Sequence, residues 1–139
     1  MSVSIEIPVA WGDMDAYGHV NNTVFLRWCE SARIAFFERI GLDRCREETG
    51  ISGILASVQC RYKTPVTYPD SVKVTASLLR LGEQDFELSY EIVSQKLQRV
   101  AAQASDRLVS YDYRQLAKAS WPEAVMSRIR EVCAAEAES

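Results

Sequence analysis

The chain has 139 residues, of which 47% are hydrophobic and 25% are charged, a composition typical of a globular domain with a buried core. Its net charge of −3 provides no basic surface, so we expect neither nucleic acid nor an anionic membrane as a partner. No N-terminal segment resembles a signal peptide, and no apolar run is long enough to cross a bilayer. We therefore expect a single domain over residues 1–139, located in the cytoplasm.

Four cysteines and one histidine limit the metal chemistry that the chain can support. Cys29, Cys45, Cys60 and Cys133 are widely spaced, with no C-x-x-C pair, so we expect reduced and mostly buried thiols. His19 is the single histidine and cannot form a multi-histidine centre. The sequence therefore predicts no metal site.

The first stretch of the chain predicts a strand that leads into a loop with two carboxylates. Ile5 and Ile7 alternate with polar residues, which predicts a strand over residues 3–11, and Pro8 favours an edge position or a bulge. The loop that follows carries Asp13 and Asp15.

A long helix is predicted from Asn21 or Asn22 to Gly41. Asn is a preferred N-cap residue, and Gly is frequent just past the last helical turn. Apolar residues cover most of the helix circumference at helical spacing, which predicts a buried helix: Phe25, Trp28, Cys29, Ala32, Phe36 and Ile40. Its first turn lies next to the aspartate loop, where backbone N–H groups could polarise a carbonyl oxygen.

The rest of the chain predicts four consecutive strands and a short helix. Residues 42–53 are polar and predict a connection with at most a short turn of helix. From Ile54 the apolar period changes to two, which predicts a half-buried strand that Pro65 ends, and further strands over residues 72–82, 86–92 and 100–113. Ser120 and Glu123 have the spacing of a capping box that opens a helix to about Ala135.

This order of elements predicts the α+β class, with an antiparallel sheet that packs one face on the long helix. One helix cannot cover both edges of such a sheet. An exposed edge strand invites pairing with another chain, so we expect a homo-oligomer.

The segment from Trp11 to Trp28, W-G-D-M-D-A-Y-G-H-V-N-N-T-V-F-L-R-W, is similar to a motif of a known family. Together with the C-E-S-A-R that follows it and Tyr68-Pro69-Asp70-x-Val72, it resembles the hotdog-fold acyl-CoA thioesterases, in particular the 4-hydroxybenzoyl-CoA thioesterase-like family. The resemblance implies a five-stranded antiparallel sheet wrapped around one long buried helix, in βαββββ order with a C-terminal helix. It also implies an acyl-CoA substrate, no cofactor, and a homodimer or homotetramer with active sites at the subunit interface.

The resemblance further implies which residues form the site. Asp15 takes the place of the catalytic carboxylate, which attacks the thioester carbonyl or activates a water. The backbone N–H groups at the helix start polarise the carbonyl oxygen. The expected oxyanion and substrate-binding residues are Tyr17, Gly18, His19, Val20, Asn21 and Asn22.

Several residues allow a second interpretation. Asp13 is expected to hydrogen-bond within the loop and is an alternative base, and Glu30 is a rival base unless it is ion-paired with Arg27 or Arg33. His19 either orients Asp15, lines the pocket or has a structural role. Ser57 and Thr64 could reach a partner subunit's site, and basic strand residues could receive the CoA phosphates: Arg61, Lys63 and Arg80.

Two other functions remain open from the sequence. A hotdog dehydratase acting on 3-hydroxyacyl thioesters would need a histidine base, for which His19 is the one candidate. A binding module would retain affinity for acyl-CoA without turnover. The sequence also leaves open the acyl group, the choice between CoA and a carrier protein, and the choice between nucleophilic and general-base catalysis.

Overall fold

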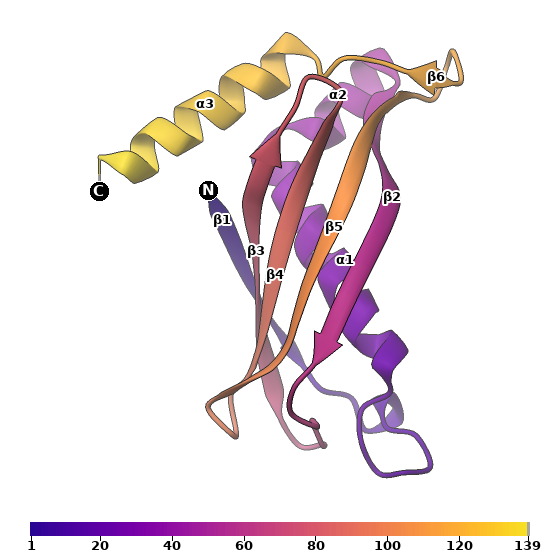
Figure 1. The fold of residues 1–139 in the computed structure, drawn as a ribbon, viewed down its shortest axis with the longest axis vertical. Helices are drawn as coiled ribbons and strands as arrows, with labels where there is room; N and C mark the ends of the chain where they lie inside the picture. The colour runs from indigo at the N-terminus through magenta and orange to yellow at the C-terminus, as the bar shows by residue number, and fades with distance from the viewer. Residues whose placement is uncertain (139) are drawn as a thin grey trace.

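The computed structural model describes residues 1–138, which form an antiparallel sheet wrapped around one long helix (Figure 1). The strand order is β1-β3-β4-β5-β2, with a short sixth strand paired to β5. The strands are β1 (Ser2–Pro8), β2 (Ile51–Tyr62), β3 (Ser71–Leu81), β4 (Asp85–Ser94), β5 (Arg99–Asp112) and β6 (Ala117–Lys118).

Helix α1 (Asn22–Arg39) lies along one face of this sheet and carries much of the core. Its buried face contains the residues that the apolar period predicts, together with Val24 and Arg33, and it packs on alternate residues of β3, β4 and β5. Burial of each large apolar side chain contributes about 1.5–3 kcal/mol, so this interface stabilises the arrangement strongly. The hotdog fold expected from the resemblance is confirmed. No helix within residues 1–138 combines the length and the apolarity needed to cross a membrane.

The first strand is shorter than predicted. It ends at Pro8, and residues Trp11–Asp13 form a turn of 3₁₀ helix, η1. Val9 is buried but Trp11 is 73% exposed, so the apolar run does not continue the strand. The strand therefore ends three residues earlier than the sequence predicts, and the carboxylate of Asp13 lies at the end of η1.

A second helix, α2 (Leu42–Thr49), occupies most of the segment predicted as a polar connection. Gly41 and Gly50 bracket it in left-handed conformations, with φ of 75° and 81°. Only Leu42 and Cys45 are buried, so the helix has little apolar periodicity by which to predict it. As a result, β2 begins at Ile51, three residues before the predicted start.

The prediction of a half-buried β2 is wrong for most of its length. β2 is an edge strand, paired only with β5, and its residues from Ile54 to Gln59 are exposed. A register shift between Leu55 and Ser57 also breaks the alternation, so Ile54 faces the side opposite to Val58. A two-residue period in the sequence reveals neither an edge position nor a bulge.

The predicted capping box of the last helix does not form. Helix α3 (Glu123–Ala137) has Pro122 at its N-cap and no side-chain cap, and the Glu123 carboxylate instead accepts hydrogen bonds from Ser127 and Arg130. Packing holds the helix in place, because Trp121 stacks on Phe86 and the buried face of α3 covers one end of the core: Val125, Ile129 and Val132.

One charged pair lies inside the core. Arg33 is 8% exposed and donates two hydrogen bonds to Asp106 Oδ2, from Nε at 2.9 Å and from Nη2 at 2.7 Å. The Tyr90 hydroxyl donates to the same oxygen at 2.6 Å, and burial raises the pKa of Tyr90, so this hydroxyl keeps its proton. Arg33, one of the two arginines considered as partners of Glu30, therefore pairs with Asp106 instead.

Candidate active site

The loop between η1 and α1 is a tight turn with Asp15 at its base. Met14 and Val20 pair as an antiparallel bridge, and the Asp15 N–H donates to the His19 carbonyl at 3.0 Å. The Gly18 N–H donates back to the Asp15 carbonyl at 3.0 Å, and Gly18 has a φ of 78°, a conformation that favours glycine. The backbone on both sides of Asp15 is thus fixed.

The Asp15 carboxylate is exposed, and both of its oxygens accept a hydrogen bond. Oδ1 accepts from the backbone N–H of Tyr17 at 2.9 Å, which forms an Asx turn. Oδ2 accepts from the side-chain amide of Asn21 at 3.3 Å. Each oxygen retains lone pairs that face solvent, so the carboxylate is oriented but still free to react.

Asp13 has different surroundings. It is 9% exposed, its Oδ1 accepts from Arg27 Nη2 at 2.8 Å, and its Oδ2 accepts from the Ala10 N–H at 2.9 Å. Its carbonyl accepts from the Asn21 N–H at 3.0 Å. Asp13 therefore fixes the loop to α1, and Arg27 pairs with Asp13 rather than with Glu30.

The amides at the start of α1 are not equally free. The Val20 N–H donates to the Val66 carbonyl at 2.9 Å, and the Asn21 N–H is taken by Asp13. The Thr23 N–H donates to Asn21 Oδ1 at 2.9 Å, which makes Asn21 the N-cap. Within residues 1–138, the Asn22 N–H has no acceptor. Of the three amides expected from the sequence, Asn22 is the one free to bind a substrate oxygen.

A pocket of about 230 Å³ opens beside this amide, lined by His19, Asn22, Phe25, Tyr62, Lys63 and Thr64, among others. The Tyr62 hydroxyl donates to the Asn22 carbonyl at 3.1 Å, and its ring meets Phe25 edge-to-face at 5.3 Å. Burial raises the pKa of Tyr62 to about 12, so the hydroxyl remains a donor. The sequence predicts Tyr62 only as a residue of the strand that Pro65 ends. Its place three residues before Pro65, near the end of that strand, is the one signal that the sequence offers.

The remaining expected residues fall into two groups. Thr64 and Lys63 line the pocket, although the Thr64 hydroxyl is bonded to the Val100 carbonyl at 3.1 Å. Ser57 and Arg61 alternate with Tyr62 along β2, so they face the side of the sheet away from α1. Within this chain they do not join the pocket.

Glu30 is exposed on α1, two turns beyond Asn22, and makes no hydrogen bond or ion pair within the described part of the chain. Arg80 donates to Asp85 and Glu87 on the far side of the sheet, which leaves it unsuited to a phosphate. Within residues 1–138 the His19 ring has no acidic partner, so the His19 side chain does not orient the Asp15 carboxylate.

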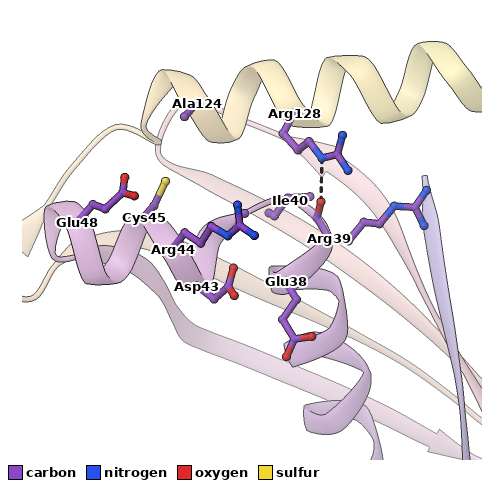
Figure 2. Close-up of a pocket in the computed structure, with 10 residues that line it drawn as sticks. Glu38, Arg39, Ile40, Asp43, Arg44, Cys45, Glu48, Ala124 and Arg128 are labelled. Carbon is purple, nitrogen blue, oxygen red and sulfur yellow. Dashed lines mark hydrogen bonds between the residues drawn. The ribbon is translucent and has the colours of Figure 1, made fainter.

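A larger hollow of about 550 Å³ lies at the other end of α1, where α1, α2 and α3 meet (Figure 2). Its walls carry three arginines and three carboxylates, and Arg128 Nε donates to the Arg39 carbonyl at 3.3 Å. Burial raises the pKa of Cys45, so this thiol is a poor nucleophile. The hollow is about 27 Å from the N-terminus of α1, because an 18-residue helix rises ~1.5 Å per residue. It offers no catalytic constellation.

A hotdog fold with an exposed, oriented carboxylate at the N-terminus of its buried helix is the arrangement that the resemblance to thioesterases implies. The family comparison agrees. Residues 9–129 match the profile of the thioesterase-like superfamily, and the chain belongs to this family.

The individual relatives and solved structures that match this chain share about a third of its residues or fewer. The PA2801 protein of Pseudomonas aeruginosa, provisionally assigned as a thioesterase, is 31% identical; the match covers 91% of this chain and 96% of that one, with a TM-score of 0.80. The 1,4-dihydroxy-2-naphthoyl-CoA thioesterase of Synechocystis shares the fold, with a TM-score of 0.81 and 20% identity over 93% and 96% of the two chains. Protein THEM6 of Xenopus laevis is 29% identical over 90 residues, which cover 65% of this chain and 44% of that protein.

Proposed function

We propose that the protein is an acyl-CoA thioesterase, which hydrolyses an acyl-CoA to a free acid and CoA. The observation that carries the proposal is the Asp15 carboxylate, which is exposed and held by two hydrogen bonds, one of them from the side chain of Asn21, the residue directly before the free Asn22 amide. Membership of the thioesterase-like superfamily and the naphthoyl-CoA thioesterase among the structural neighbours support the same class of reaction.

In the proposed reaction, Asp15 attacks the thioester carbonyl or removes a proton from a water that does so. The carbonyl oxygen gains negative charge, and the Asn22 N–H at the positive end of α1 stabilises it. The C–S bond then breaks and CoA leaves as a thiolate, which is a good leaving group. If Asp15 is the nucleophile, water hydrolyses the resulting anhydride and releases the acid. Neither route needs a metal or an organic cofactor.

Asp13 is poorly suited to this role, because its two oxygens are occupied by Arg27 and by the Ala10 amide. Glu30 is free but lies two helical turns from the Asn22 amide. Asp15 is therefore the preferred base or nucleophile.

We further propose that the active enzyme is a homodimer, or a pair of dimers, formed through β2. Large apolar side chains on this edge strand are about 40% exposed: Ile54, Leu55 and Val58. Edge-to-edge pairing would bury them and would bring a partner's residues over the open pocket at Tyr62. Lys63 lines the pocket and is the candidate for contact with the CoA phosphates. We expect the enzyme to act in the cytoplasm.

The test is thiol release from short, long and aromatic acyl-CoAs by the wild type and by Asp15→Asn, Asp13→Asn and Glu30→Gln. We expect Asp15→Asn to lower kcat by at least about 10², the scale of general-base loss, with milder effects from the other two. A larger loss in Asp13→Asn or Glu30→Gln would move the chemistry to that residue. Absence of turnover on every substrate would refute the thioesterase proposal and favour the dehydratase or the binding module.

A further inference from the structure

Asn21 connects the start of α1 to the carboxylate of Asp15. Its Oδ1 accepts hydrogen bonds from the N–H and the hydroxyl of Thr23, at 2.9 and 2.8 Å. Its Nδ2 donates to Asp15 Oδ2 at 3.3 Å, and its backbone N–H and carbonyl are also bonded. Every polar atom of Asn21 therefore has a partner, and those partners belong to both the helix and the loop.

The orientation of this side-chain amide follows from its partners. The Thr23 N–H can only donate, so the atom facing it must be the oxygen of the amide. The NH₂ group is then directed at Asp15. A flipped amide would set two donors against each other at Thr23 and two acceptors against each other at Asp15.

We propose that Asn21 is a positioning residue that holds the Asp15 carboxylate against the N-terminus of α1, a role that rests on the proposed thioesterase function. The second anchor of the carboxylate, the Tyr17 N–H, belongs to the same short turn. Asn21 is thus the one anchor that ties Asp15 to the helix carrying the free Asn22 amide. It fixes the separation between the group that attacks and the group that stabilises the oxyanion.

Three substitutions separate this role from helix capping. Asn21→Asp retains a capping oxygen and the side-chain shape, but it replaces the donor with a carboxylate that repels Asp15. Asn21→Ser also retains a capping oxygen but is too short to reach Asp15. Asn21→Ala removes both functions. Ser and Asp cap helices about as well as Asn, whereas Ala does not.

The experiment measures kcat, KM and Tm for these variants. We expect Asn21→Asp and Asn21→Ser to keep a Tm close to that of the wild type while kcat falls about 10- to 100-fold, since small misplacements of reacting groups cost that much. KM should change little. Asn21→Ala should lose both kcat and Tm. If Asn21→Asp and Asn21→Ser are as active as the wild type, Asn21 is only a helix cap and the proposal is overturned.

A second readout does not depend on turnover. The carboxyl carbon of Asp15, labelled with carbon-13 and assigned through its loss in Asp15→Asn, reports on its hydrogen bonds by NMR. We expect its resonance to move in Asn21→Asp and Asn21→Ser and to stay in place in Gln115→Glu. This control adds the same charge as Asn21→Asp in the turn between β5 and β6, at the other end of the sheet (Figure 1).

The two readouts separate the two proposals. A moved resonance without turnover on any acyl-CoA would support the positioning role and refute the thioesterase. Turnover with an unmoved resonance would support the thioesterase and refute the positioning role.

Discussion

At the scale of single residues, the surroundings of a side chain decide its role more than its type does. Asp13 and Asp15 are two residues apart and chemically identical, yet Asp13 is buried against Arg27 and Asp15 faces solvent. The Arg27 guanidinium and the Ala10 N–H each take up one oxygen of Asp13, whereas the two uncharged donors around Asp15 orient its carboxylate without neutralising it. The same loop therefore supplies one carboxylate for structure and one for chemistry.

The cysteines differ in the same way. Burial raises the pKa of Cys29 to about 12, and the side chain is fully buried on α1, whereas Cys133 on α3 is only half-buried. A raised pKa lowers the thiolate fraction at pH 8, and the thiolate is the form that reacts with iodoacetamide. We expect Cys29 to be alkylated at least about 10² more slowly than Cys133 in the folded protein. Mass spectrometry of peptides checks this, with urea-unfolded protein as the control. Equal rates in the folded protein would contradict the burial of Cys29.

At the scale of elements, α1 both fills the core and carries the site, and this combination made it the most predictable part of the chain. Its apolar period and its Asn cap predict its span and burial correctly. Arg33 could not be predicted, because its burial depends on Asp106 and Tyr90, which lie far away in the sequence. The distinction between the amides of Val20, Asn21 and Asn22 was equally hidden, since their acceptors are set by how the loop folds back.

The Arg33–Asp106 pair connects α1 to β5 and makes a testable contribution to stability. Removing one partner leaves an uncompensated charge in the core, so we expect Arg33→Met to lower the free energy of unfolding by about 3–5 kcal/mol. The double variant Arg33→Met/Asp106→Leu removes both charges and should recover most of that loss, because apolar residues often replace a buried pair without cost. Urea denaturation of both variants and of the wild type measures this. A double variant no more stable than Arg33→Met would show that the pair is not the source of the loss.

At the scale of the whole molecule, the exposed edge and the open pocket occur together. β2 ends at Tyr62, the residue that forms one wall of the pocket, and the apolar part of β2 lies directly before it. The order of the elements in the sequence predicts that the sheet has an exposed edge strand, which can pair with another chain. Pro8 favours an edge position for β1, which the structure confirms, but the sequence does not show that β2 forms the other edge, because β2 lies beside β5 through pairing between segments that are distant along the chain.

If β2 pairs with a second copy, charge placed on this edge should separate the subunits. We expect wild-type protein to have two or four times its chain mass of 15.7 kDa in light scattering, and Ile54→Lys/Val58→Lys to have half the wild-type mass, because like charges would meet across the paired edges. Leu116→Lys, which alters an exposed residue outside β2, should leave the dimer intact. Thiol release should fall together with the mass, since the pocket beside Asn22 would lose the wall supplied by the partner. A fully active monomer would show that one chain contains the whole site, and a dimer that survives both lysines would place the interface elsewhere.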